Sequence, residues 1–581
     1  MEEKFDYIVV GGGMAGLAVA SRLSEKPELT VLVLEAGETG INNPAISVPG
    51  LMVTNLGSDI DWNFCTVPQE GANQRKMSYP RGKVLGGSSA INFMMSSRAE
   101  AEDYDAIKRL GNPGWGWTEI ERASKKSEKL IIPPTNSPYI FNPESHGRDG
   151  PVVNSFPKYI PPQFTSYFTA CAAAGHVIQK KDPFAGKLEG AYIYPSAIDD
   201  HGSRVTSATA YYFPNQSRTN LVVRTNCEVN KLILKNNGDN SELQVLGVEY
   251  SSCGTPFRVL VTKEVIMSAG SIGTPAILER SGIGNEQILK SLNIPVTLNL
   301  KGVGFNLSDH VFVIANYRLK PGHRTLEDLT KDPGYAAEQK LIYEQSGGGL
   351  FSHPTSIFNF QSLRSIVSED EMNEGLKLLK NCPSYLSPKQ FEAVVDRIMN
   401  GVALEFSLVN TFFEPELPSD RDTSYLTANV ILQYPLSRGS SHIQSQDPGA
   451  APLIDPKFLM HPFDAWLLAQ GAKEIRKIMA QDAHQDIILD EHYPGPSVQT
   501  NEQWEESVRR RALTSYHPCG TCSMLPQSES GVVDPQLRVY GTQNLRVVDA
   551  SILPVQLTSH PAMTVYAIAE KAAEMILNQS N

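Results

Sequence analysis

The first forty residues contain the pattern that most constrains the fold. A short apolar run at residues 5–10 leads directly into Gly11, Gly13 and Gly16, spaced G-x-G-x-x-G, and the apolar segment LAVASRL follows. In such a pattern the first glycine permits a tight turn, the second lets a pyrophosphate approach the backbone, and the third lets the helix pack on the strand. The segment therefore predicts a strand, a turn and a helix whose N-terminus faces phosphates. A glycine-rich turn that binds no ligand is the alternative.

A second apolar run, TVLVL, ends at Glu35 and Ala36. A carboxylate at the end of this strand can accept hydrogen bonds from ribose hydroxyls, and it disfavours the 2′-phosphate of NADP. We therefore expect a dinucleotide site, although this motif does not distinguish FAD from NAD. The candidate residues at this end of the chain are Gly11, Gly13, Met14, Ala15, Gly16, Glu35 and Ala36.

The composition is ordinary for a folded protein, with 41% hydrophobic and 20% charged residues. The chain has 581 residues, which is more than one core usually fills, so we expect two domains or one large domain with a cap. A formal net charge of −12 argues against a nucleic-acid partner, since phosphate binding depends on clustered Lys and Arg. The seven cysteines are scattered and odd in number, which favours reduced thiols over a disulfide framework. No metal site is predicted.

The N-terminal segment and the lengths of the apolar runs indicate where in the cell the protein is expected. The segment MEEKFDYIVV has neither a basic region nor an apolar core ahead of the first predicted strand, so we expect no secretory signal and a cytoplasmic protein. A processed form of a secreted protein is the alternative. No apolar run is long enough to span a bilayer, so no membrane association is expected.

The order of predicted elements indicates an α/β fold. Residues 5–37 alternate strand, helix and strand, as in a parallel sheet. Short β-branched runs between residues 220 and 270 predict further strands. From about residue 311 to residue 515 the pattern changes to prolines, glycines and longer helical runs, which we interpret as a cap over the substrate.

Eight motifs in order along the chain resemble the glucose-methanol-choline (GMC) oxidoreductases, which are FAD proteins. They are VGGGMAGLAVA with LEAG, DWNFCTVPQ, PRGKVLGGSSAIN, SRVTSATAYYFP, SAGSIGTPAILERSGIG, KGVGFNLSDH, PLSRG and the terminal block from HPCGTC to SHPAMTVYAIAEKAA. The members that the chain resembles most are the aryl-alcohol oxidases. The resemblance implies a Rossmann-like FAD-binding domain from residues 1–310 and 516–581, with a substrate-binding cap domain from residues 311–515 built on a β-sheet with helices. Parts of residues 150–200 are further candidates for the cap.

The resemblance also implies particular cofactor-binding residues. The loop PRGKVLGGSSAIN and the residues after it line the flavin and pyrophosphate, a strand residue meets the adenine, and the C-terminal motifs reach the flavin. These positions are Leu85, Gly87, Ser89, Asn92, Met94, Val229, Asp549, Ala550, Pro561 and Ala562. Two positions depart from the family. Ile91 stands where some relatives carry a histidine bonded covalently to FAD, so we expect non-covalent FAD. Glu279 replaces a usual aliphatic residue, which puts the local helix packing in doubt.

Two histidines near the C-terminus, His517 and His560, are each followed by a proline. Oxidation of an alcohol needs a base for the hydroxyl proton, and imidazole has a suitable pKa of about 6.5. The resemblance places His517 at the catalytic base and His560 at the second active-site position, where it would bond the substrate oxygen. Pro561 suits the first turn of a helix, whose N-terminal partial charge would favour an anionic reduced flavin. Capping or packing is the alternative role for each histidine.

The substrate prediction is an aromatic, allylic or specialised-metabolite alcohol. Phe93, Tyr516, Phe412 and Phe413 resemble wall residues of aryl-alcohol oxidases, and aromatic walls favour flat apolar alcohols. Packing of these rings between cap and flavin domain is the alternative, and a sugar substrate stays open. We predict oxidation to an aldehyde or ketone by hydride transfer to flavin N5, with oxygen or another acceptor reoxidising the cofactor.

Three other functions compete with this one. A lyase of the hydroxynitrile lyase type would use the same histidines with a structural FAD. A flavin-binding protein without redox activity would keep the cofactor and lack turnover. Cys519 and Cys522, spaced C-x-x-C, could form a redox dithiol.

Overall fold

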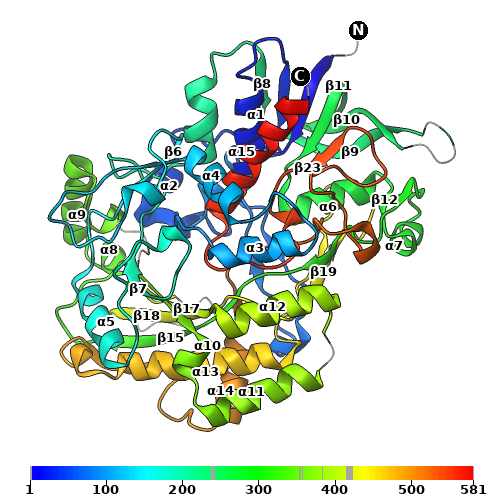
Figure 1. Ribbon diagram of the computed structural model, residues 1–581. Helices are drawn as coiled ribbons and strands as arrows, with labels where there is room; N and C mark the ends of the chain where they lie inside the picture. Colours follow the sequence, from blue (N-terminus) through cyan, green and yellow to red (C-terminus); the bar gives the residue numbers. More distant parts are fainter. Residues whose placement is uncertain are drawn as a thin grey trace.

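In the computed structural model the chain forms two large β-sheets connected by helices (Figure 1). The structure describes residues 3–236, 238, 242–352, 355, 357–382, 384–413 and 423–579. The first sheet combines strands from the N-terminal, middle and C-terminal parts of the chain, and the second is antiparallel. The fold is therefore of the mixed α/β class, with a Rossmann-like sheet and a separate antiparallel sheet.

The first sheet has the strand order β8-β2-β1-β11-β10-β9, with β23 also paired to β11. Its nucleotide-binding part is parallel, whereas β9, β10 and β11 form an antiparallel meander. The apolar runs of β1 and β2 are almost entirely buried, as expected for parallel strands covered on both faces. The strands are β1 (Lys4–Val10), β2 (Val31–Leu34), β8 (Leu221–Arg224), β9 (Cys227–Lys235), β10 (Gln244–Ser252), β11 (Thr255–Met267) and β23 (Leu545–Val547).

Helices from opposite ends of the chain lie side by side on this sheet. Helix α1 (Met14–Leu23) packs beside the C-terminal helix α15 (Ala562–Gln579), and α4 (Trp117–Ser127) packs on α15 (Figure 1). Glu570 of α15 is fully buried and lies 2.8 Å from Arg22 of α1. A buried carboxylate with a hydrogen-bonded cation holds its charge inside the protein at a lower cost. This pair joins the two ends of the chain.

The second sheet has the order β21-β15-β18-β17-β16-β7, with β22 paired to β15. Its central strands, β17 and β18, are buried along their whole length. The strands are β7 (Gly190–Ile193), β15 (Val311–Leu319), β16 (Ile357–Ser362), β17 (Val402–Val409), β18 (Tyr425–Leu432), β21 (Ile488–Tyr493) and β22 (Leu513–Thr514).

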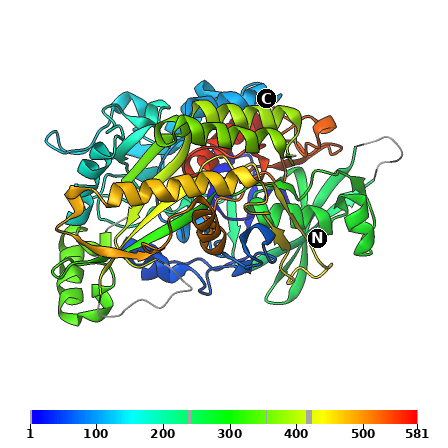
Figure 2. The ribbon, with the colours of Figure 1, turned by 90° about the horizontal axis from the view of Figure 1, so that it is seen from below.

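A layer of helices covers one face of the second sheet. Figure 2 shows α13 lying across this face. These helices begin at recognisable caps. Ser368, Ser387 and Thr500 each form a capping box at the start of α11, α12 and α14. The helices of this layer are α5 (Pro162–Ala173), α10 (Leu363–Ile366), α11 (Glu369–Asn381), α12 (Pro388–Asn400), α13 (Pro462–Met479) and α14 (Asn501–Arg511).

Shorter elements surround the two sheets. The helices are α2 (Pro44–Ser47), α3 (Ala101–Arg109), α6 (Gly270–Arg280), α7 (Glu286–Ser291), α8 (Asp328–Lys331) and α9 (Pro333–Ser346). The strands are β3 (Phe64–Cys65), β4 (Ser78–Tyr79), β5 (Glu128–Leu130), β6 (Val152–Asn154), β12 (Ile283–Gly284), β13 (Leu298–Asn299), β14 (Phe305–Leu307), β19 (Gly439–His442) and β20 (Leu453–Asp455).

The two sheets do not follow the predicted boundaries at every point. Strand β7, from the stretch 150–200 predicted as a further candidate for the cap, belongs to the second sheet. Strands β19 and β20, from within residues 311–515, pair with β14 and lie next to α6 of the nucleotide-binding half.

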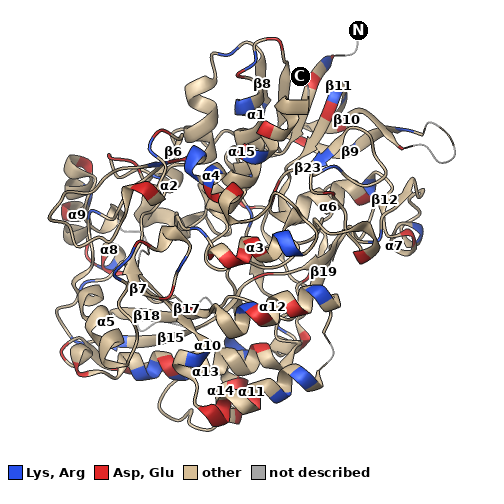
Figure 3. Ribbon diagram, viewed as in Figure 1, with Lys and Arg blue, Asp and Glu red and all other residues tan. Residues whose placement is uncertain are grey.

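Two further observations concern the distribution of charged residues and the possibility of a membrane-spanning helix. The coloured ribbon of Figure 3 shows acidic and basic residues interspersed along α11, α12 and α14. Within the part of the chain that the structure describes, no helix combines the length and apolarity needed to cross a bilayer.

Candidate active site

A cavity of about 520 Å³ is lined by residues from both large sheets. On one side it meets Val10 and Leu34 at the carboxyl ends of β1 and β2, where parallel sheets usually bind nucleotides. On the other side it meets Phe312, Ser407 and Asn429 of the antiparallel sheet. The cavity therefore joins a nucleotide-type site to a second chamber.

The glycine turn at the start of α1 has the conformation that the motif predicts. Gly11 has a φ of +101°, and a Cβ atom there would lie 2.5 Å from the carbonyl oxygen of Ser268. A Cβ atom on Gly16 would lie 2.0 Å from the carbonyl oxygen of Gly11. Gly13 precedes α1 and provides no side-chain cap, so N–H groups of the first turn are available to a ligand. Gly13, Met14 and the following alanine line the cavity.

Glu35 lines the cavity at the end of β2. Its Oε2 accepts a hydrogen bond from the Gly12 amide at 2.8 Å, and its Oε1 accepts one from the Gly37 amide at 2.8 Å. Burial raises the pKa of this carboxyl to about 7. Each oxygen has two lone pairs, so one remains on each for a ligand hydroxyl.

Most of the predicted cofactor residues lie around the cavity. Those that line it are Gly11, Gly13, Met14, Ala15, Glu35, Ala36, Gly87, Asn92, Met94, Val229, Asp549, Ala550, Pro561 and Ala562. Gly16, Leu85 and Ser89 are not in its lining. Ser89 instead donates to the Gly86 carbonyl oxygen and accepts from the Ser207 amide, so it holds the loop from behind.

Several lining residues were not predicted. The residues from Ser268 to Gly273, which lead into α6 and form its first turn, line the cavity, and so does the segment from Pro448 to Pro452. The glycine-rich sequence SAGSIG directly after β11 repeats the strand–glycine–helix pattern of β1 and α1, and this signal could have identified α6. The segment 448–452 carries no comparable signal.

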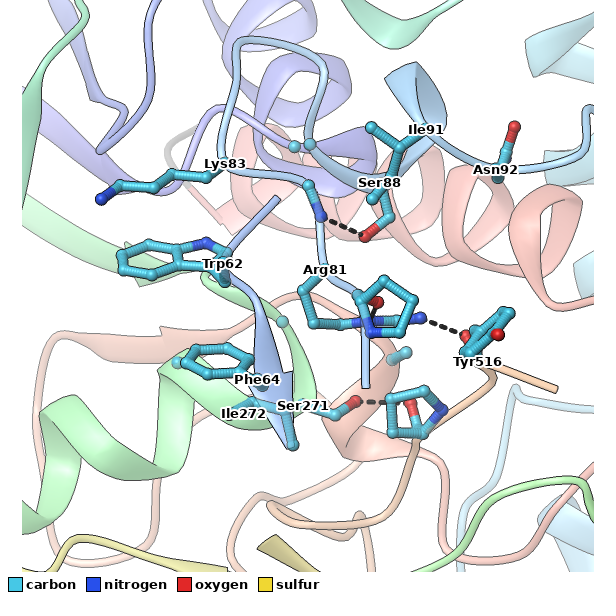
Figure 4. A pocket seen from close by; sticks show the side chains of 18 of the residues that line it. Trp62, Phe64, Arg81, Lys83, Ser88, Ile91, Asn92, Ser271, Ile272 and Tyr516 are labelled. Carbon is cyan, nitrogen blue, oxygen red and sulfur yellow. Dashed lines mark hydrogen bonds between the residues drawn. The ribbon is translucent and has the colours of Figure 1, made fainter. Parts of the chain in front are cut away.

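Aromatic and basic side chains form another unpredicted wall. Trp62 and Phe64 stack with ring centroids 5.6 Å apart, and Lys83 Nζ lies 4.6 Å from the Trp62 ring centroid. Figure 4 shows these three side chains together on one side of the cavity. Arg81, also visible there, donates to the carbonyl oxygen of Tyr516 at 2.5 Å.

The arrangement fits an FAD molecule. The unsubstituted glycine turn and the uncapped N-terminus of α1 suit a pyrophosphate, and Glu35 suits a ribose hydroxyl. Val229 and Ile277 add apolar surface to the lining, which suits burial of an adenine ring. Ile91 also lines the cavity, and its side chain offers no atom for a covalent bond to a flavin.

His517 and His560 meet in the cavity wall. Their ring centroids are 4.7 Å apart, and the rings are nearly perpendicular at 86°. His560 lies just before α15, and the Val565 amide donates to the Pro561 carbonyl oxygen, so Pro561 stands at the entry of this helix. The pair therefore faces the same space from two separate segments of the chain.

His310, which was not predicted, lies behind His517. The Nδ1 atoms of the two rings are 2.9 Å apart. Nε2 of His310 lies 3.0 Å from the carbonyl oxygens of Gln433 and Leu557, which only accept hydrogen bonds. His310 therefore carries its proton on Nε2, and its Nδ1 accepts the proton that His517 carries on Nδ1. This leaves Nε2 of His517 with a lone pair.

The surroundings keep both of these rings uncharged. Burial, with a smaller contribution from the nearby His560, lowers the pKa of His310 to about 3. Burial also lowers the pKa of His517 well below its usual 6.5, and His560, His310 and Arg81 add to this effect. A neutral imidazole at His517 can accept a proton.

His560 is oriented by a buried carboxylate. Its Nε2 lies 2.9 Å from Oε1 of Glu405 on β17, and this residue has a fully buried side chain. Gln433 donates to Glu405 at 3.3 Å and accepts a 2.6 Å hydrogen bond from the Ser559 amide, next to His560. Neither Glu405 nor Gln433 was predicted, and no local motif marks them.

The backbone around His517 is held by Asp309. Its Oδ1 accepts from the His517 amide at 2.8 Å, and its Oδ2 accepts from Thr514 Oγ1 at 2.6 Å. Tyr516 between them has a φ of +64°, a strained value for a non-glycine residue. Burial raises the pKa of Asp309 to about 6. Asp309 and His310 are the last two residues of the motif KGVGFNLSDH.

Three of the four predicted substrate residues line the cavity. Phe93, Phe413 and Tyr516 are in its wall, and Phe93 meets Phe413 edge to face with centroids 6.4 Å apart. Phe412 is not in the lining, and its ring packs against Tyr425 and His492. Phe312 of β15 adds an unpredicted ring and stacks on Phe413 at 6.4 Å.

The two C-x-x-C cysteines do not form a redox dithiol. Cys519 and Cys522 are free and buried. Burial raises the pKa of Cys519 to about 12 and that of Cys522 well above its usual value. Reactive cysteines need accessible sulfur and thiolate character, and these have neither. Cys519 instead lies 2.6 Å from Gln556 Oε1.

The unusual Glu279 in α6 has partners of its own. Its carboxylate lies 2.7 Å from Nδ1 of His442 and accepts from the Ile443 amide at 2.9 Å. The acidic side chain therefore ties α6 to β19, which explains how a charge is accommodated at a fully buried position.

Comparisons with known proteins show the family to which the chain belongs. Two family models described as GMC oxidoreductase match residues 5–312 and 435–569. A GMC oxidoreductase family protein of Malassezia sympodialis, Mala s 12, is 36% identical over 593 residues, covering 99% of this chain and 93% of the relative.

Solved structures show the same fold. An FAD-dependent oxidoreductase from Chaetomium thermophilum superimposes with a TM-score of 0.90 at 30% identity, covering 99% of both chains. A fungal aryl-alcohol oxidase superimposes with a TM-score of 0.85 at 26% identity, covering 100% of both chains. The chain belongs to the glucose-methanol-choline (GMC) oxidoreductase family, and it is an FAD-dependent oxidoreductase of that family.

Proposed function

We propose that the protein oxidises primary aromatic alcohols to aldehydes with non-covalently bound FAD and with His517 as the base. The observation that carries this proposal is the hydrogen bond between the Nδ1 atoms of His517 and His310, at 2.9 Å. It leaves the lone pair of His517 Nε2 available to a hydroxyl proton. When bound, FAD supplies the hydride acceptor, and oxygen or another acceptor takes the electrons afterwards.

The two histidines then have separate tasks. His517 accepts the hydroxyl proton at Nε2 because its burial keeps the ring neutral. His560 positions the alcohol oxygen, and its hydrogen bond to Glu405 limits rotation of the ring. Holding the reacting groups in one orientation lowers the barrier by removing the entropy cost of alignment.

The substrate class follows from the wall of the cavity. Phe93, Phe312 and Phe413 lie around the same chamber as the two histidines. Aromatic rings bury flat apolar groups favourably and stack on them. The similarity to a fungal aryl-alcohol oxidase supports the same class.

Anaerobic mixing with benzyl alcohol tests the proposal. We expect the oxidised flavin absorbance to bleach and benzaldehyde to appear in a one-to-one ratio with the bleached flavin. Turnover of a cyanohydrin without bleaching would overturn the proposal in favour of a lyase. Bleaching by sugars with none by aromatic or allylic alcohols would overturn the substrate class.

A further inference from the structure

We propose that Asn429 and Ser407 select alcohols whose aromatic ring carries a second, uncharged hydrogen-bonding oxygen across the ring from the carbinol. This inference rests on the proposed function and names the substrate class more narrowly. Phenolic and ether oxygens in the para position are the expected groups. The two residues lie on neighbouring strands and line the same cavity as the histidines.

The register of the second sheet places this pair at a defined distance from the reacting groups. Ser407 is two residues after Glu405 on β17, so both side chains are on one face of the sheet. Asn429 lies directly opposite Ser407 on β18. Two residues along a strand span about 7 Å. Because Glu405 holds His560, the Asn429–Ser407 pair lies one such step from the end of the cavity where the carbinol is positioned.

The hydrogen bonding of the pair leaves a donor for a ligand. Ser407 Oγ donates to Asn429 Oδ1 at 2.7 Å. Because the amide oxygen is held by Ser407, the amide nitrogen of Asn429 points away from Ser407. Among the described residues, none accepts a hydrogen bond from Asn429 Nδ2. Asn429 is only 8% exposed. Because Asn429 lines the cavity, a ligand that covers its amide nitrogen without accepting a hydrogen bond costs about 1–3 kcal/mol, so a ligand oxygen that accepts from it is favoured.

The rest of this chamber is apolar, which makes the pair selective. Phe312, Val409, Phe413 and Ile431 line the wall around it. A benzene ring fits such a wall by burial, and the amide then distinguishes substituents on the far side of the ring. The Asn429 amide is an uncharged donor, so we expect the second oxygen on the substrate ring to be uncharged as well. A para-methyl group has a similar size and cannot accept a hydrogen bond.

A second pair on the same sheet provides a matched control. Thr427 Oγ1 donates to Asn316 Oδ1 at 2.6 Å, and these residues are also opposite each other on β18 and β15. Neither residue is in the lining of the cavity. A role confined to holding the sheet together would apply equally to both pairs, whereas substrate selection applies only to Asn429 and Ser407.

The experiment compares the wild-type holoenzyme with Asn429→Leu, Ser407→Ala and Asn316→Leu. Anaerobic flavin reduction is measured with 4-hydroxybenzyl alcohol and 4-methylbenzyl alcohol, and the ratio of their second-order rate constants is taken within each protein. A ratio within one protein does not depend on its folded fraction or flavin content. We expect about tenfold preference for the hydroxyl compound in the wild type, the equivalent of roughly 1.4 kcal/mol.

In Asn429→Leu the ratio should fall to about one, with the methyl compound still oxidised, and Ser407→Ala should give an intermediate ratio because the amide is no longer directed. Asn316→Leu should keep the wild-type ratio. A wild-type ratio near one, or an unchanged ratio in Asn429→Leu, overturns the inference. Absence of flavin reduction by both alcohols in the wild type instead overturns the proposed function itself.

Discussion

Nδ1 of His517 lies 2.9 Å from Nδ1 of His310, and this contact determines which nitrogen of His517 can accept a proton. His310 is itself held by two backbone carbonyl oxygens at 3.0 Å, so its donor and acceptor nitrogens are not interchangeable. The orientation of the base therefore depends on a residue that does not line the cavity.

Replacing the base should slow the chemical step strongly. We expect His517→Ala to lower the rate of anaerobic flavin reduction by at least about 10²-fold, the usual contribution of a general base. Stopped-flow absorbance with benzyl alcohol measures this rate directly. A decrease of less than tenfold in flavin-containing protein would show that another group removes the proton.

His310 should act on the rate as a positioning residue. His310→Phe removes the acceptor for the His517 Nδ1 proton, so the ring loses its preference for the tautomer with a free Nε2. We expect flavin reduction to slow by about tenfold or more, in the range seen when a histidine loses its orienting partner. His484→Phe, another buried histidine outside the cavity lining, is the control and should leave the rate within about twofold. Equal rates in the two variants would contradict the assignment.

The rate should depend little on pH below neutrality. The pKa of His517 is held well below 6.5 by burial, and only the unprotonated ring accepts a proton. The flavin reduction rate is therefore expected to stay level from pH 8 to about pH 6. A protonation step near pH 6.5 in a stopped-flow pH profile, assigned to His517 by its loss in His517→Ala, would be the contrary result.

Stability should fall in acid because of His310. Its pKa is about 3 in the folded chain and about 6.5 when unfolded, so between these values only the unfolded chain binds the proton. The free energy of unfolding then decreases as pH falls from 6.5 towards 3, by about 1.4 kcal/mol per pH unit for this group. Denaturant titrations of the holoenzyme at pH 7, 6 and 5 should show a shallower dependence in His310→Phe. The exposed His201→Gln should match the wild type.

Removing one buried cation should lower the stability of the contact between the two halves of the molecule. Arg397 of α12 lies 2.5 Å from Glu100 and 3.0 Å from Asp103, and all three side chains are at most 9% exposed. Arg397→Met leaves two buried carboxylates without their cation, which typically costs about 3–5 kcal/mol.

Thermal unfolding of the flavin-containing protein tests this expectation. Lys389 lies on the same helix as Arg397, and its side chain is 65% exposed. Lys389→Met removes its ion pair with Glu529 and should change stability by at most about 1 kcal/mol. Similar melting temperatures for the two variants would refute a stabilising role for the Arg397 cluster.

The nucleotide end of the site could be predicted because its signal is local. Gly11, Gly13 and Gly16 are close in sequence, and steric limits on the turn restrict their replacement. Glu35 follows at the end of the next strand, where parallel pairing brings it to the same edge. His517 and His560 were likewise marked by short motifs. No long-range contact had to be known to select these residues.

The sequence by itself therefore determined the local elements that carry a nucleotide turn, a carboxylate and two histidines, and the family resemblance of its motifs predicted that they belong to one redox site. Only the tertiary structure decided the partners of those histidines and the shape of the substrate chamber. Glu405 and Asn429 lie on the neighbouring strands β17 and β18, and His310 directly precedes β15, so strand register sets where these separate segments lie relative to one another. Register also sets which face each side chain takes, because a shift of one residue turns it to the other side of the sheet. The physical reason is that hydrogen-bonded pairing between distant segments has no signature in any short stretch of sequence.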